Sequence, residues 1–197
     1  SEPVTSDYHH YDITHGFELQ FDSSFQNHFL TYGIDYSLTE NKYLQDKYIT
    51  FYGFPYHVVN NVEYPIKRSP DSDTQRLGIY LQDEVSYKNF VIIGGLRFDN
   101  YKINPSPDSI YLNYCSTGGD CEVVSLDSSN FSPKIGVTYP LNDDLKIWGQ
   151  YSRGFRSPSW WELQATHLNL TADPPYQRIP NPDLKSESSN SYEIGFR

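Results

Sequence analysis

The amino-acid sequence predicts an all-β chain, a segment of an antiparallel transmembrane β-barrel, and three observations lead to this fold class. Apolar and polar residues alternate with period two in several stretches, and the connections between those stretches are alternately short and long. Aromatic residues make up 16% of the chain, with 18 Tyr and 11 Phe, and these side chains favour strands. Period-two alternation is typical of strands that face lipid on one side and a polar lumen on the other.

The mean hydropathy of -0.64 agrees with such a barrel, because the lipid-facing and lumen-facing residues of each strand offset one another. No stretch approaches the roughly 18 consecutive apolar residues that a membrane-spanning helix requires. We find no linker that would divide the chain, so residues 1–197 are assigned to one barrel domain.

Seven strands are expected from the alternation. In the second of them, Leu30, Ile34 and Leu38 lie on one face, opposite Thr31 and Ser37. The expected strands are 12–21, 28–38, 75–86, 90–103, 131–139, 145–155 and 188–197. The positions predicted to face lipid include Ile34, Tyr36, Leu77, Ile79, Leu81, Leu96, Phe98, Ile135 and Val137. Those predicted to face the lumen include Asp35, Gln82, Glu84, Arg97 and Lys134.

The connections predict the orientation of the barrel. Short connections, rich in Asp, Asn, Ser or Pro, are expected at 22–27, 88–89 and 140–144. Long ones are expected at 39–74, 104–130 and 156–187. Outer-membrane barrels have short periplasmic turns and long extracellular loops, so we expect the long segments, and residues 8–11, outside the cell. Because an open sheet leaves two unpaired edges, further strands are expected on both sides, with about 22 in the whole barrel if it encloses a plug.

Composition argues against several classes of function. The net charge of -10 and the pI near 4.9 disfavour nucleic acid and anionic headgroups as main partners, because like charges repel. No nucleophile elbow, phosphate-binding glycine loop or zinc-ligand spacing is found, so no enzyme is expected. The chain has no Met, and residues 1–11 lack the regions of a signal peptide, so we expect a processed chain or a fragment.

Two cysteines lie close together in the sequence. Cys115 and Cys121 flank a short loop in which Gly118 and Gly119 favour a tight turn, which would bring the two Cα atoms within disulfide range. A disulfide implies export from the cytosol. Two free thiols are the alternative.

Two short motifs carry a resemblance to a known family. The first is Phe155-Arg156-Ser157-Pro158, which resembles the FRAP box of TonB-dependent outer-membrane receptors. The second is Asn181-Pro182-Asp183-Leu184, which resembles their NPNL box. The flanking stretches 131–139, 148–158 and 185–195 are similar to the later barrel strands of the family. Ser157 replaces the usual Ala, and Asp183 replaces the usual Asn.

Both boxes also have a physical interpretation that needs no family. Pro158 lacks the N–H that would continue a strand ladder, so strand pairing is expected to stop there. Asn181-Pro182 marks a turn before the last strand, and Pro180 stiffens the approach to it. We therefore expect the boxes to act mainly as structural hinges of a long loop.

The resemblance implies a receptor in the outer membrane of a Gram-negative cell, and within the family it favours receptors for haem or haemoglobin iron. Such a receptor takes up haem by TonB-dependent active transport, with a plug domain and an energy-coupling partner that these residues do not contain. Haem is then the transported ligand, and no permanently bound cofactor is expected. A receptor for a ferric siderophore or for cobalamin is the alternative, because both boxes occur across the broader family. A passive porin and a barrel enzyme are more distant alternatives.

The interval between the boxes holds the candidate ligand residues. The resemblance implies a loop histidine there, and His167 is the only histidine in that interval. Neutral imidazole ligates haem iron axially, and Tyr176 is a second candidate through its phenolate. A polar residue on an exposed loop is the plainer interpretation of His167. Trp160 and Trp161 either pack on porphyrin or belong to an interfacial aromatic belt, and we favour the belt.

A further pair of candidates lies in Tyr8-His9-His10-Tyr11. Adjacent imidazoles can pass haem onward or bind a metal ion. Neighbouring residues on a strand point to opposite faces, so His9 and His10 would share one ion only if this segment were irregular.

Overall fold

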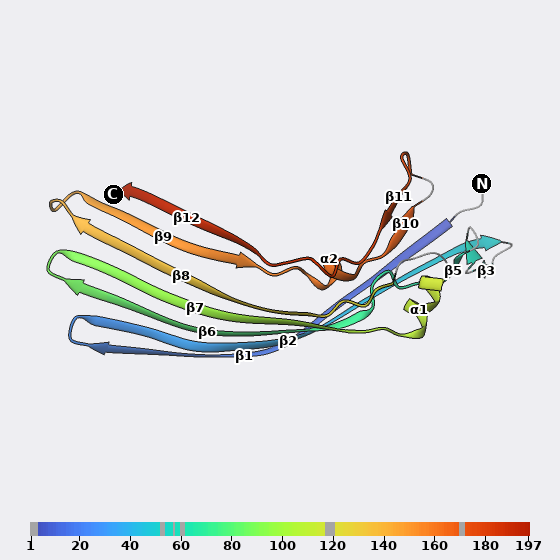
Figure 1. The fold of residues 1–197 in the computed structure, drawn as a ribbon, viewed down its shortest axis with the longest axis horizontal. Helices are drawn as coiled ribbons and strands as arrows, with labels where there is room; N and C mark the ends of the chain where they lie inside the picture. Colours follow the sequence, from blue (N-terminus) through green and yellow to red (C-terminus); the bar gives the residue numbers. More distant parts are fainter. Residues whose placement is uncertain (1–3, 52–53, 57, 60–61, 117–120, 170–171) are drawn as a thin grey trace.

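Seven long strands form one antiparallel sheet in the order β1-β2-β6-β7-β8-β9-β12 (Figure 1). The computed structural model describes residues 4–51, 54–56, 58–59, 62–116, 121–169 and 172–197. The strands are β1 (Val4–Phe25), β2 (His28–Phe51), β6 (Asp71–Tyr87), β7 (Phe90–Ser106), β8 (Leu126–Pro140), β9 (Lys146–Arg156) and β12 (Glu187–Phe196). Within the described residues, β1 and β12 are the two edges of the sheet. The predicted fold class and strand number are confirmed.

The strands extend further than the apolar pattern predicted. β1 and β2 form a continuous ladder that reaches Val4 and Ile49, so β2 runs to residue 51 instead of ending at 38. β8 likewise begins at residue 126 instead of 131, and the turn predicted at 22–27 shrinks to Gln26 and Asn27. Backbone pairing continues after the lipid-facing side chains end, because the hydrogen bonds of the ladder do not depend on them.

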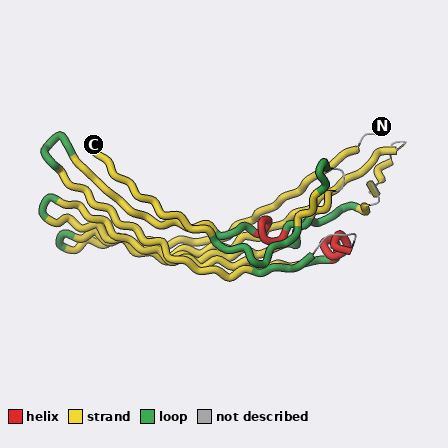
Figure 2. The backbone as a smooth tube through the Cα atoms, turned by 45° about the horizontal axis from the view of Figure 1, so that its top comes forward, coloured by secondary structure: helices red, strands yellow, loops and turns green. Residues whose placement is uncertain are grey.

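The alternation of short and long connections is confirmed (Figures 1 and 2). The short turns lie at one end, and two of them begin with a left-handed residue, Gln26 at φ 54 and Lys88 at φ 53. The sheet is bent along its strands, and the irregular elements gather at the other end (Figure 2). These elements are β3 (Phe54–Tyr56), β4 (Val58–Val59), β5 (Val62–Glu63), α1 (Ser109–Ser116), α2 (Trp160–Gln164), β10 (His167–Asn169) and β11 (Tyr176–Arg178). Among the described residues, no helix has the length and apolar character needed to cross a membrane.

The register of the sheet confirms the predicted division into two faces. Ile34, Ile79, Phe98 and Phe131 lie directly opposite one another across four neighbouring strands. The rings of Phe98 and Phe131 are 5.1 Å apart, and Ile79 and Phe131 remain 48% and 55% exposed. A continuous apolar face of this kind needs a non-aqueous neighbour, in accord with the expected contact with lipid.

The opposite face carries polar side chains and a cluster of paired charges. Arg97 Nη1 lies 2.8 Å from Asp35 Oδ2, and Arg97 Nη2 lies 2.8 Å from Asp99 Oδ1. Arg76 contacts the same carboxylate of Asp99, which is only 2% exposed, at 3.2 Å. A Cβ at Gly78 would overlap the Arg97 guanidinium, so the missing side chain makes room for the cluster. Because a buried charge requires a partner, these pairs tie β2, β6 and β7 together on the lumen side.

A small buried core lies at the loop end, on the same face as the charge cluster. Ile103 of β7, Val124, and Trp160 and Leu163 of α2 form it, with exposed fractions between 0% and 6%. The partly buried residues packed against it are Tyr43, Tyr101, Leu126, Trp161 and Leu184. Because Ile103 and Tyr101 share the lumen face, α2 folds inward over the sheet. Burial of a side chain such as Leu163 contributes about 1.5–3 kcal/mol to this packing.

The expectation that Trp160 and Trp161 belong to an interfacial belt is wrong. Trp160 is 6% exposed within the core, and the ring of Trp161 lies 4.9 Å from that of Tyr43. The ladder ends before Pro158, and a capping box between Ser159 and Glu162 starts α2 and turns the chain inward. Residues after this point therefore no longer follow the alternation of the strand.

Cys115 and Cys121 form the predicted disulfide, with their Cα atoms 5.6 Å apart. Cys115 lies in the last turn of α1, so the bond closes the segment that follows this helix. The tight turn predicted at Gly118 and Gly119 lies outside the described residues.

We predict that single cysteines along β6 will label alternately in the whole receptor in lipid bilayers. Cysteines replacing Gln82 and Glu84 should react with an aqueous thiol reagent, whereas those replacing Ile79 and Leu81 should not, because lipid excludes the reagent. Mass spectrometry of each variant, in a background with both native cysteines replaced by Ser, measures the reaction. Uniform labelling along β6 would contradict the assignment of the faces.

We also predict that unreduced protein recovered from the outer membrane carries an internal Cys115–Cys121 link. The loop is short, so by chain entropy the bond stabilises it by at most about 3 kcal/mol, and the double Ser variant should keep its barrel. Peptide mapping without reduction detects the link. Two freely alkylated thiols would refute the prediction.

Candidate functional site

The first motif ends β9 and joins three elements through one arginine. Arg156 is the last residue of β9 and lies opposite Glu187, the first residue of β12. Its guanidinium donates to both carboxylate oxygens of Glu162 in α2 at 3.0 Å and lies 3.4 Å from Glu187 Oε1. A bidentate contact between arginine and a carboxylate is stronger than a single hydrogen bond between them. Arg156 therefore clamps α2 to the ends of β9 and β12.

The clamp makes Glu162 unusually acidic. The hydrogen bond from Arg156, followed by that from the Ser159 backbone N–H at 2.8 Å, lowers the pKa of Glu162 from 4.5 to about 2. Because the folded pKa is below the unfolded one, ionised Glu162 stabilises this junction above pH 4.5. The contribution is lost as the pH falls from there toward 2.

The second motif is held against α2. The backbone N–H of Asn181 donates to the carbonyl of Leu163 at 2.9 Å, and the Asn181 side-chain oxygen accepts from the backbone N–H of Asp183 at 3.0 Å. Leu184 packs against the buried core. The turn uses the backbone N–H of Asp183. It therefore does not require the side-chain amide of the Asn that the family usually has at this position. Both motifs therefore make structural contacts with α2.

Between the motifs, the short hairpin β10–β11 brings His167 and Tyr176 together. His167 lies opposite Arg178 and Asn169 lies opposite Tyr176, so these four side chains share one face of the hairpin. The rings of His167 and Tyr176 are 5.9 Å apart and nearly perpendicular, at 77°. Asn169 Nδ2 donates to the Tyr176 hydroxyl at 3.4 Å. The two predicted iron ligands thus lie on one surface.

His167 is half-buried, and its surroundings favour the neutral ring. Burial, and to a smaller degree the positive charge of Arg68, lowers the pKa of His167. Neutral imidazole has the free lone pair that a metal ion needs. Its Nδ1 is buried and has no hydrogen-bond partner among the residues that the structure describes.

His9 and His10 do not converge. β1 is a regular strand at these residues, so the two side chains point to opposite faces. His10 faces the interior, where its ring lies 5.8 Å from that of Trp160 and its Nε2 lies 3.2 Å from Asp12. His9 stacks on Tyr11 at 6.3 Å on the outer face. The condition for a shared ion, an irregular segment, is not met.

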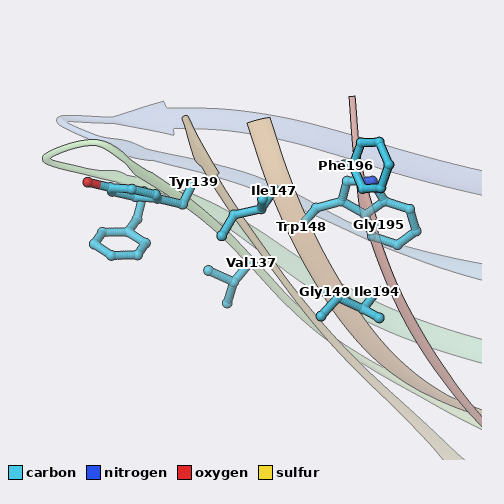
Figure 3. Close-up of a pocket in the computed structure, with 9 residues that line it drawn as sticks. Val137, Tyr139, Ile147, Trp148, Gly149, Ile194, Gly195 and Phe196 are labelled. Carbon is cyan, nitrogen blue, oxygen red and sulfur yellow. The ribbon is translucent and has the colours of Figure 1, made fainter. Parts of the chain in front are cut away.

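A large apolar hollow of about 800 Å³ lies far from this hairpin, near the short turns (Figure 3). Its lining residues are Phe90, Val137, Tyr139, Ile147, Trp148, Gly149, Ile194, Gly195 and Phe196. Most of them share the lipid-facing set of positions, so the hollow is part of the outer surface of the sheet. Among the described residues, no group of three or more His, Cys, Asp or Glu side chains could hold a metal ion. The hairpin therefore remains the candidate site.

Sequence reasoning missed the partners that position this site. The pattern Ser159-x-x-Glu162 directly after Pro158 is a capping-box signature and could have located both α2 and Glu162. No local signal links Arg68 to the hairpin. Its carbonyl accepts from the backbone N–H of Thr166 at 2.7 Å, a contact between residues far apart in the sequence.

Residues 2–197 match the family model described as "TonB dependent receptor-like, beta-barrel". The hemin receptor of Yersinia enterocolitica is 25% identical over 183 residues, which cover 89% of this chain and 22% of that protein. The TonB-dependent heme receptor A of Haemophilus influenzae (strain 86-028NP) is 25% identical over 196 residues, which cover 93% of this chain and 24% of that protein. The chain thus spans about a quarter of the length of these relatives.

Solved structures show the same fold. The copper transporter OprC superposes with a TM-score of 0.67 at 15% identity, over 98% of this chain and 28% of that one. The FrpB iron transporter from Neisseria meningitidis (F5-1 variant) superposes with a TM-score of 0.50 at 21% identity, over 75% of this chain and 21% of that one. At these identities the likeness concerns the architecture alone.

We predict that Glu162→Gln will loosen the junction at neutral pH and remove its acid sensitivity. In the unaltered receptor, amide protection of residues 159–165 should fall as the pH drops from 4.5 toward 2, because Glu162 becomes protonated. In the variant, protection should be lower at pH 7 and nearly independent of pH over that range. Hydrogen exchange with correction for intrinsic rates measures both, and Glu122→Gln, at an exposed glutamate of another long connection, is the control. Equal protection in Glu162→Gln and the unaltered protein at pH 7 would contradict the role of the clamp.

Proposed function

The chain belongs to the TonB-dependent receptor-like β-barrel family, and on that premise we propose that it is part of an outer-membrane receptor that takes up haem, with His167 as an axial ligand of the iron. The observation that carries this proposal is the shared face of His167 and Tyr176 on the β10–β11 hairpin. Imidazole and phenolate are both axial ligands of haem iron in proteins. A lysine would be protonated, and carboxylates suit harder ions, so this pair of side chains favours haem.

Two further observations support haem as the cargo. The two relatives described above are a hemin receptor and a heme receptor. Beside the hairpin, Trp161 is half-buried, with Arg178 lying 5.8 Å over its ring, and this aromatic side chain provides an apolar neighbour for a porphyrin. Ferric siderophores and cobalamin are the competing cargoes within the family, and the two structural motifs do not distinguish between them and haem.

The proposal assigns this chain the extracellular mouth and part of the wall of the receptor. The long connections, including the hairpin, would lie outside the cell, and the short turns would face the periplasm. A plug domain and the TonB energy-coupling complex would be supplied by parts outside these residues. The cargo would be haem, free or delivered by haemoglobin, and the role is transport without catalysis.

We predict that His167→Ala in the full-length receptor will weaken haem binding and change the visible spectrum of bound haem. Replacing a residue that hydrogen-bonds to a metal ligand lowers metal affinity by about 10–100-fold. Loss of the ligand itself should therefore weaken haem binding by at least about tenfold. Outer-membrane assembly should be unaffected, because loops tolerate substitution. Spectroscopic titration of the purified receptor with haem measures the affinity and the spectrum.

The matched control is His15→Ala, which removes a histidine from the lipid-facing side of β1 and should leave both readouts unchanged. Tyr176→Phe tests the second candidate on the same face. An unchanged spectrum, affinity and haem-dependent growth in His167→Ala would reject the assignment of His167. Tight binding of a ferric siderophore without any binding of haem would reject haem as the cargo.

A further inference from the structure

Backbone hydrogen bonds at Ile66 and at Arg68 itself hold the main chain of Arg68 beside the hairpin. Ile66 exchanges two backbone hydrogen bonds with Gln45 of β2, at 2.9 and 3.0 Å. The carbonyl of Arg68 accepts from the backbone N–H of Thr166, the residue before His167, at 2.7 Å. Ser69 after it is fully buried. These contacts hold the main chain of Arg68 next to the start of β10.

The Nε of Arg68 has no partner among the residues that the structure describes. This nitrogen is buried, and no carboxylate among the described residues forms an ion pair with Arg68. This differs from the neighbouring Lys67, which pairs with Asp71 at 2.8 Å and Asp108 at 2.6 Å. A buried donor without a partner destabilises the folded protein, so the Nε of Arg68 indicates a partner that comes from outside the described residues.

The charge around His167 is locally positive on a protein whose net charge is -10. Arg178 lies opposite His167 on the same face of the hairpin, and its guanidinium is held by the ring and carbonyl of Trp161 without pairing to a carboxylate. The carbonyl of Arg68 accepts a hydrogen bond from Thr166, so the Arg68 side chain starts from main chain that lies next to this histidine. Two arginine side chains that form no ion pair with a carboxylate among the described residues therefore lie near the imidazole of His167.

We propose that Arg68, assisted by Arg178, binds a carboxylate of the porphyrin whose iron is ligated by His167, an inference that rests on the proposed function. A porphyrin carries its propionates at the ring edge, away from the axial positions of the iron. A protein side chain that binds the propionates must therefore lie to one side of the axial ligand, near the edge of the porphyrin ring. Arginine suits this role because it is always charged and matches the two oxygens of a carboxylate. Arg68 is then the residue that distinguishes an acidic porphyrin from an uncharged one.

The test compares iron protoporphyrin IX with its dimethyl ester, in which both carboxylates are masked, on the full-length receptor. The unaltered protein should bind the free acid about tenfold more tightly than the ester, since a hydrogen bond to a charged group contributes about 1.5 kcal/mol or more. In Arg68→Met this preference should fall to about twofold or less. The absorption spectrum of the bound haem should stay unchanged, because His167 is intact. Arg68→Lys should keep part of the preference, since it retains the charge and loses only the two-pronged geometry.

Three further results separate this inference from the proposed function. His167→Ala should change the spectrum yet keep the preference for the free acid. Arg153→Met, at an exposed arginine of β9, should alter neither readout. Equal affinity of the unaltered receptor for acid and ester would overturn the role of Arg68 while leaving haem uptake in place. If neither porphyrin binds, both proposals are overturned.

Discussion

The structure depends on one constraint, which is that every backbone N–H and C=O within lipid must find a partner in a neighbouring strand. The continuous antiparallel ladders from β1 to β12 satisfy it across the sheet, apart from the two edges of the described chain. Once the ladders are in register, alternation decides the face of each side chain. Phe98 then faces outward, and Asp99 faces the interior, where Arg76 and Arg97 neutralise it.

The same constraint moves irregular structure to one end of the strands. There the Arg156 clamp, the capped start of α2 and the turn at Asn181 form a rigid junction over a small buried core. The two sequence motifs belong to this junction and not to the candidate site.

The proposed ligand chemistry rests on a few side chains near that junction. Burial, and to a smaller degree the charge of Arg68, lowers the pKa of His167 and so favours the neutral ring that the proposal requires, while the two arginines near it would suit an anion. Haem combines both features, because its iron takes an imidazole and its propionates take cations. The acidity of the rest of the chain makes this positive site distinct from its surroundings.

The sequence by itself determined the strand number, the two faces, the alternation of connections and the disulfide, and it singled out His167 and Tyr176 as candidate ligands. Period-two alternation, proline positions and cysteine spacing are local properties, so residues such as Ile79, Pro158 and Cys115 reveal their roles without a fold. Only the tertiary structure decided how far β2 extends, that Trp160 turns inward, and that Arg68 stands beside His167. These outcomes depend on contacts between residues far apart in the chain, such as the hydrogen bond from Thr166 to Arg68, and no local pattern encodes them.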